Sequence, residues 1–292
     1  MERFCIQSLL QKFLSYSVNT KYSLVYSVEF MMDMGHKNKI DIKVRLHNYI
    51  ILYAKRCSMT VSSGNETLTI DEGQIAFIER NIQINVSIKK SDSINPFEII
   101  SLDRNLLLSI IRIMEPIYSF QHSYSEEKRG LNKKIFLLSE EEVSIDLFKS
   151  IKEMPFGKRK IYSLACLLSA VSDEEALYTS ISIASSLSFS DQIRKIVEKN
   201  IEKRWRLSDI SNNLNLSEIA VRKRLESEKL TFQQILLDIR MHHAAKLLLN
   251  SQSYINDVSR LIGISSPSYF IRKFNEYYGI TPKKFYLYHK KF

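Results

Sequence analysis

Two pairs of basic residues, fifty positions apart, are the groups in this sequence best placed to do chemistry. Arg222-Lys223 and Arg272-Lys273 each follow, by about five residues, a serine that can begin a helix. Arginine can donate two parallel hydrogen bonds to guanine, and both residue types neutralise phosphates. Helix charges are often only solvated, but the repeated placement favours contact with a nucleic acid.

The excess positive charge lies almost entirely in the last third of the chain. The 292 residues include 42 Lys and Arg against 32 Asp and Glu, a net charge of +10. Counted along the sequence, residues 190–292 contain 19 basic and 10 acidic residues, and residues 1–189 contain 23 and 22. A basic field confined to one region predicts a polyanionic partner, because bound phosphates release their counterions.

Residue sets for catalysis or metal binding are not found. His36, His47 and His122 are scattered without a His-x-His pattern, and the adjacent pair His242-His243 lies about 100° apart on a helix, which favours two exposed side chains. No Gly-rich phosphate loop, Gly-x-Ser-x-Gly motif or Cys-x-x-Cys pair occurs. We therefore expect no cofactor, metal or catalytic residue. A cupin-type metal enzyme is the competing class.

The sequence also predicts a cytoplasmic protein without a membrane partner. No run approaches 18 uncharged apolar residues, and the first residues lack the pattern of a signal peptide. Three widely spaced cysteines favour a reduced compartment.

Helix punctuation places the first basic pair on the second helix of a helix-turn-helix. Ser208 and Ser217 can cap two short helices, and Val221 and Leu225 share the inward face of the second. Its outward residues are then Ile219, Arg222 and Lys223. A Thr231/Gln234 capping box begins a helix of about 20 residues, roughly 30 Å long. This length is close to one turn of B-DNA, about 34 Å.

A second helix-turn-helix follows that long helix. Ser266 is the expected N-cap of its second helix and Pro267 the first helical residue, with Tyr269, Phe270 and Phe274 inward. The remaining positions face outward and are the predicted DNA contacts of this unit: Ser268, Ile271, Arg272 and Lys273. Isoleucine can meet a thymine methyl group, and arginine can read guanine.

The first 185 residues show a different pattern of apolar and polar residues. Strand-like runs occur at 22–30, 48–54, 57–62, 67–70, 74–79 and 82–90, which favours a sandwich or small barrel. Helical patterns then follow at about 104–114, 140–152, 158–170 and 173–184. Ser185-Ser186-Leu187-Ser188 is the expected hinge, so we predict one domain over 1–185 and a second over 190–292. Trp205 is expected to pack at a domain edge.

The C-terminal residues resemble those of AraC/XylS-type regulators. The match rests on Gly263-Ile264-Ser265-Ser266-Pro267-Ser268-Tyr269-Phe270, on Gly279-Ile280-Thr281-Pro282-Lys283-Lys284-Phe285, and on Arg240-Met241…Ala244…Leu247-Leu248. This resemblance implies an α+β chain: an N-terminal cupin-like β-barrel with following dimerisation helices, then an all-α domain with two helix-turn-helix units joined by a long helix.

The residue composition of the chain is similar to that of the Rns, ToxT and RegA group of enteric virulence activators. The resemblance implies a homodimer that binds double-stranded DNA at AT-rich promoters, works with RNA polymerase and activates virulence genes, often by relieving nucleoid silencing. It also implies a small effector sensed by the barrel, such as bicarbonate or a fatty acid. A nonspecific architectural DNA binder is the alternative within DNA-binding proteins.

The predicted barrel strands carry cations and phenols suited to an anionic effector. They are Lys21, Tyr22, Tyr26, Arg56 and Arg80, with Tyr16 nearby. A cation and phenol hydroxyls can fix a carboxylate or a small anion. Ordinary strand faces are the alternative interpretation.

Overall fold

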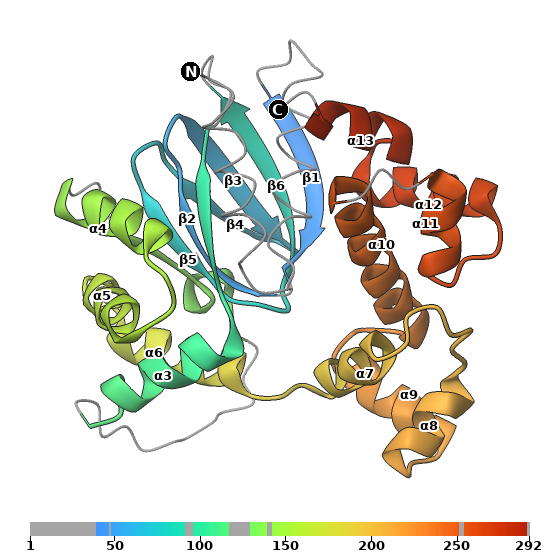
Figure 1. The fold of residues 1–292 in the computed structure, drawn as a ribbon. Coiled ribbons are helices and arrows are strands. Elements are labelled where there is room, and N and C mark those ends of the chain that lie inside the picture. Colours follow the sequence, from blue (N-terminus) through green and yellow to red (C-terminus); the bar gives the residue numbers. More distant parts are fainter. Residues whose placement is uncertain are drawn as a thin grey trace.

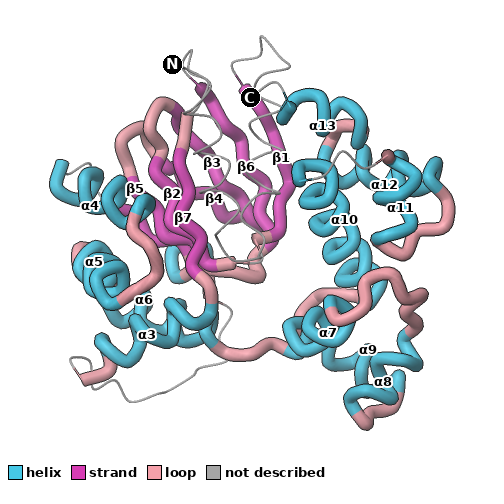
Figure 2. Tube along the Cα trace, viewed as in Figure 1, coloured by secondary structure: helices cyan, strands magenta, loops and turns pink. Residues whose placement is uncertain are grey.

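The computed structural model describes residues 39–46, 48–90, 96–116, 129–138, 142–250 and 254–290. Within these residues, strands and helices form the N-terminal domain, and the C-terminal domain consists of helices (Figures 1 and 2). No helix in this described part is long and apolar enough to cross a membrane. The strand predicted at 22–30 lies outside the described residues.

In the part of the chain that the structure describes, eight strands form two four-stranded antiparallel sheets, ordered β1-β6-β3-β4 and β7-β2-β5-β8. An apolar core between them includes Leu52, Val61 and Val86. The strands are β1 (Lys39–Arg45), β2 (Tyr49–Tyr53), β3 (Cys57–Ser63), β4 (Glu66–Ile70), β5 (Ile75–Ile78), β6 (Gln83–Lys90), β7 (Glu98–Leu102) and β8 (Ile135–Leu138). The sheet-rich N-terminal domain that the sequence predicts is therefore observed.

Helices cover the other face of the second sheet, on the left in Figure 1: α3 (Arg104–Met114), α4 (Glu142–Glu153), α5 (Lys158–Leu168) and α6 (Glu174–Ser185). A second core joins Tyr49, Ile51 and Phe77 of the sheet to these helices. Because both faces of β2 are covered, its sequence is a continuous apolar run rather than an alternating one.

Side-chain caps set where two of these helices begin. Asp103 accepts a hydrogen bond from Leu106 N at 2.9 Å, as its position before α3 predicts. Asp173 caps α6 by accepting from Ala176 N at 3.1 Å, so this helix begins one residue after the predicted start at 173. Strand β8 was missed because a four-residue apolar run is too short for periodicity to separate strand from helix.

Over its described residues, 189–250 and 254–290, the C-terminal domain contains seven helices: α7 (Phe189–Glu198), α8 (Leu207–Leu214), α9 (Glu218–Ser227), α10 (Phe232–Asn250), α11 (Ile255–Leu261), α12 (Pro267–Tyr278) and α13 (Pro282–Lys290). They enclose two cores. Ile235 and Ile239 of α10 belong to the first, with α7, α8 and α9, whereas Met241 and Ala244 belong to the second, with α11, α12 and α13. The long helix therefore joins two small units.

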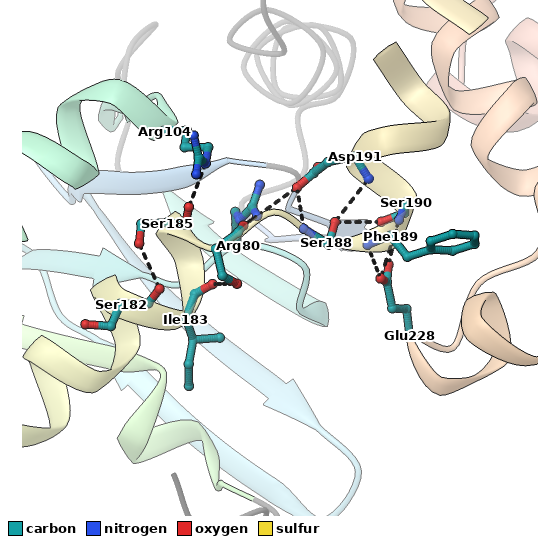
Figure 3. Close-up of polar contacts among 11 residues, drawn as sticks. Arg80, Arg104, Ser182, Ile183, Ser185, Ser188, Phe189, Ser190, Asp191 and Glu228 are labelled. Atoms are coloured by element: carbon teal, nitrogen blue, oxygen red, sulfur yellow. Dashed lines mark hydrogen bonds and ion pairs between the residues drawn. The ribbon is translucent and has the colours of Figure 1, made fainter. Parts of the chain in front are cut away.

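The predicted hinge between the domains is fastened by arginines of the N-terminal domain (Figure 3). Arg80 Nη2 donates to Ser186 O at 2.6 Å and to Asp191 Oδ2 at 2.9 Å. Arg104 Nε donates to Ser185 O at 2.7 Å. Asp191 also accepts from Ser188 N as part of the capping box of α7. The connection between α6 and α7 is thus bonded to the sheet domain.

A second polar contact lies where β1 meets the turn after α9. Arg45 Nη2 donates to the carbonyl oxygen of Glu228 at 3.2 Å. The Glu228 carboxylate in turn accepts from Phe189 N at 2.6 Å and from Ser190 N at 3.2 Å, at the start of α7 (Figure 3). The N-terminal domain therefore touches the C-terminal domain around the first turn of α7.

Candidate nucleic-acid interface

The first helix-turn-helix consists of α8 and α9. Asn215 ends α8 in the left-handed conformation, with φ of 51°. Ser217 Oγ then accepts from Ala220 N at 3.1 Å, which confirms the predicted cap of α9. The cap predicted at Ser208 is wrong: the N-cap of α8 is Arg206, two residues earlier, and the Asp209 carboxylate accepts from Arg206 N at 2.7 Å.

Burial on one side of α9 turns the predicted DNA contacts outward. Val221 and Leu225 are buried in the first core, whereas Ile219 is 78% exposed. Lys223 is exposed, and the Arg222 guanidinium pairs with Glu218 at 3.3 Å on the same outward face. An exposed apolar residue beside two cations is unfavourable in water alone but suits contact with base edges and phosphates.

The second helix-turn-helix, formed by α11 and α12, repeats this arrangement. Ser266 Oγ accepts from Tyr269 N at 3.3 Å, and Pro267 occupies the first helical position, as predicted. Because Phe270 and Phe274 are fully buried, the opposite face of α12 lies outward. It presents the exposed Ser268 and Arg272 and the half-buried Ile271 and Lys273.

Tyr269 was predicted to be a core residue, and this is wrong. Its side chain is 43% exposed, with the Arg272 guanidinium 5.5 Å and Lys273 Nζ 5.9 Å from the ring centroid. Residue 269 lies about 100° from Phe270 around the helix and three positions before Arg272. The overlooked signal was the i,i+3 spacing to Arg272, which puts Tyr269 on the same outward face as that predicted DNA contact.

One acidic neighbour, Glu276, pairs with both cations of α12. Lys273 Nζ lies 2.6 Å from Glu276 Oε2, and Arg272 Nε lies 3.9 Å from Glu276 Oε1. The hydrogen bond from Lys273 and the two positive charges lower the pKa of Glu276 below its usual value. Solvent screens exposed pairs of this kind, so a phosphate can replace Glu276 as the partner of either cation.

The predicted effector residues are not assembled into one site by the described part of the chain. Lys21, Tyr22 and Tyr26 lie outside the described residues. Arg56 is exposed between β2 and β3, and its backbone N donates to Pro96 O at 2.8 Å. Arg80 is bonded to the connection between the domains, as described above. The effector site stays a prediction.

Two further predictions concern aromatic and imidazole side chains. Trp205 is 8% exposed, and its Nε1 donates to Asn200 O at 2.8 Å, which confirms packing at the edge of the first core. His242 and His243 are half-buried instead of exposed. His242 packs edge-on against Tyr277, with ring centroids 5.7 Å apart, because α12 covers this side of α10. Within the described residues, no group of potential ligands is arranged to hold a metal ion.

Two pairs of short helices, each with an exposed basic second helix, are typical of one class: the helix-turn-helix DNA-binding proteins. A family model described as a helix-turn-helix domain matches residues 210–286. The chain is 37% identical over 244 residues to the HTH-type transcriptional activator FapR of Escherichia coli, covering 83% of this chain and 94% of FapR. It is 38% identical over 248 residues to the activator CfaD of E. coli, covering 85% and 93%.

The fold is similar to that of ToxT from Vibrio cholerae. An apo structure of a ToxT point variant superposes with a TM-score of 0.64 at 19% identity, covering 87% of this chain and 98% of ToxT. A ToxT structure with a bound unsaturated fatty acid gives 0.55 at 16% identity, covering 85% and 93%. With these relatives, the chain belongs to the AraC family of transcription regulators, in the group of enteric virulence activators. These relatives are named regulators, which excludes the metal-enzyme alternative.

Proposed function

We propose that this protein is a transcription activator that reads two half-sites in double-stranded DNA with its two helix-turn-helix units. The supporting observation is that α9 and α12 each present exposed basic and apolar side chains while α10 separates the two units. Nineteen residues give α10 a length of about 28 Å. That length is close to one turn of B-DNA, about 34 Å, and suits successive major grooves on one face.

Within this proposal, each second helix combines base contacts with phosphate contacts. Arg222 and Arg272 donate to guanine, and Ile219 and Ile271 meet thymine methyl groups. The outward hydroxyl of Ser268 contacts a base edge. Lys223 and Lys273 neutralise phosphates beside the same grooves.

The N-terminal domain is proposed to supply dimerisation and a switch. We assign its paired sheets to the cupin-type barrel class and the boundary of the two domains to residues 185–190. Bicarbonate or a fatty acid is the proposed effector, with Arg56, Arg80 and the N-terminal residues Lys21, Tyr22 and Tyr26 as candidates for its recognition. The bound fatty acid in one ToxT structure supports this class of ligand.

The biological setting follows from the relatives and remains a proposal. We place the protein in the cytoplasm, as a homodimer that contacts RNA polymerase at AT-rich promoters of virulence genes. Activation there includes relief of silencing by nucleoid proteins. FapR and CfaD are both named transcriptional activators, which supports activation rather than repression of the target genes.

A salt titration tests sequence reading directly. Binding to AT-rich promoter DNA and to scrambled DNA is measured between about 50 and 200 mM salt, with and without bicarbonate or a medium-chain fatty acid. We expect a steep salt slope and a specificity ratio of at least roughly a thousand. Equal affinity for both DNAs would replace specific reading by architectural binding.

The variant Arg272→Ala tests one base contact. It is expected to cost about 1–3 kcal/mol of binding free energy and to relax preference at one position of the site. Arg112→Ala, which removes an exposed arginine of α3, is the matched control with unchanged selectivity. Unchanged affinity and selectivity in Arg272→Ala would remove this residue from the base contacts.

A further inference from the structure

The turn of the second helix-turn-helix lies directly against the segment that leads from α7 to α8. Gly263 stands in this turn with φ of +72°. A Cβ atom at this position would lie 2.7 Å from the carbonyl oxygen of Glu202 and 2.8 Å from that of Ile201. Both distances are well inside van der Waals contact. The two units of the C-terminal domain therefore touch backbone to backbone, at a place where only glycine fits.

Arg240 of α10 fills the same junction. Its Nη2 donates to Lys203 O at 3.1 Å and lies 2.8 Å from the Cβ position of Gly263. Burial lowers the pKa of Arg240, while the neighbouring Tyr269 of α12 acts in the opposite direction. Among the described residues, Arg240 Nε has no hydrogen-bond partner. The guanidinium thus contacts both units at once. We call Ile201, Glu202, Lys203, Arg240 and Gly263 the junction.

A second polar contact acts across α10 in the same way. The Asp238 carboxylate lies 3.0 Å from Arg194 Nη2 of α7. Burial raises the pKa of Tyr277 in α12 well above its usual value, and the charge of the nearby Asp238 carboxylate acts in the same direction. Asp238 is therefore paired with α7 and close enough to α12 to act on Tyr277, which opposes rotation of one unit relative to the other.

We propose that the junction holds α9 and α12 at one distance and angle, so that the protein accepts one spacing between its two half-sites. This inference rests on the proposed two-unit reading of DNA. A helix alone allows bending and twisting about its axis, whereas contacts beside the axis prevent both. Each inserted base pair shifts a half-site by about 3.4 Å and rotates it by about 34°. A fixed pair of helices cannot follow that displacement.

Two variants loosen the junction, and each has a matched control. Gly263→Ala adds the clashing Cβ; Gly64→Ala carries similar backbone strain at φ +61°, but its Cβ meets nothing within 4 Å. Arg240→Met removes the hydrogen-bonding head group. Arg260→Met removes the same charge from the second unit at a side chain that is 80% exposed.

The first readout needs no DNA. Trp205 is the only tryptophan of the chain, and its hydrogen bond to Asn200 O ties it to the segment that packs on Gly263. We expect acrylamide quenching of Trp205 in the full-length protein to rise at least twofold in both junction variants. The two control variants should match the wild type. Wild-type quenching in both junction variants would show that the contact does not hold this segment, and would overturn the proposal.

The second readout is the dependence of affinity on half-site spacing. A site selected from random DNA by the wild-type protein is lengthened or shortened by one and two base pairs. The wild type is expected to lose at least tenfold in affinity for one base pair, and the junction variants less than threefold. A junction variant that keeps the wild-type spacing profile would overturn the role of the junction, whatever its effect on Trp205.

Duplexes with either half-site scrambled separate this inference from the proposed function. If scrambling one half-site leaves wild-type affinity unchanged, two-unit reading fails and the spacing proposal fails with it. If both half-sites matter and the junction variants keep the spacing profile, only the junction proposal fails. Gly263→Ala and Arg240→Met perturb the junction by different means, so the result does not depend on one variant folding normally.

Discussion

Removing Arg80 should uncouple the two domains, because this side chain fastens the connection between them. Arg80 is 11% exposed and Asp191 21%, so their ion pair is only partly screened by solvent. The same guanidinium also donates to Ser186 O at 2.6 Å. Hydrogen bonds to charged groups contribute about 1.5–3 kcal/mol each when buried. After discounting for partial exposure, we expect Arg80→Met to cost about 2 kcal/mol of coupling between the domains.

Each domain carries its own probe of unfolding. Trp205 lies in the first core of the C-terminal domain, and Cys57 is a buried thiol in the core between the sheets. Urea unfolding is followed by Trp205 fluorescence and by pulsed labelling of Cys57. With a urea slope of about 1–3 kcal/mol per molar, Arg80→Met should lower the Trp205 midpoint by about 1 M. Arg112→Met, at an exposed arginine of α3, should leave it unchanged.

A double-mutant cycle isolates the ion pair from the cap of α7. Asp191→Asn removes the charge but keeps an oxygen that can accept from Ser188 N, so the capping bond survives. We expect a coupling energy between Arg80→Met and Asp191→Asn of at least about 1 kcal/mol, since the residues are in direct contact. A coupling within about 0.3 kcal/mol of zero, or an unmoved Trp205 midpoint in Arg80→Met, would refute the reasoning.

Three further predictions concern local stability and reactivity. Asp103→Ala should destabilise the N-terminal domain by about 1 kcal/mol in urea unfolding, and Asp103→Asn by much less, because Asn also caps helices. Burial, assisted by the charge of Lys246, lowers the pKa of His243 in the folded chain. The unfolded chain therefore takes up the proton first, and stability present above about pH 6.5 is lost as pH falls below it. Unfolding midpoints between about pH 7 and 5 should drop less in His243→Gln; an equal drop would contradict this. Burial raises the pKa of Cys57 to about 12, so a thiol reagent at about pH 8 should modify exposed Cys166 first, as peptide mass mapping can check.

Local signals in the sequence predicted the helices that carry the proposed DNA contacts. Ser217 and Ser266 cap α9 and α12 as expected, because an N-cap acts on backbone groups only two or three residues away. The same local rule oriented Arg222 and Arg272, since burial of the apolar stripe decides which face of a helix lies outward.

Contacts between distant segments could not be predicted in this way. Arg80 and Asp191 are 111 residues apart, and no local sequence pattern around either residue indicates its partner. Arg80 was interpreted as a residue that recognises an effector. The sequence shows that a strand carries a cation, but not which anionic group that cation contacts in the folded chain. Gly263 was recognised as part of a family motif, whereas its contact with Glu202 depends on how two helix pairs pack.

The apolar contacts within the C-terminal domain and the polar contacts between the two domains imply different motions. Ile239 and Met241 place α10 in both cores of the C-terminal domain, and apolar burial of this kind is lost only on unfolding. Across the domain boundary, Arg45 and Arg80 bind carbonyl and carboxylate oxygens, and water can take over these hydrogen bonds when the domains separate, at a cost of about 2 kcal/mol for Arg80. The helix-turn-helix units should therefore move together as one body when the domains separate. A signal from the N-terminal domain would then change where both units are presented to DNA, and leave the spacing that they read unchanged.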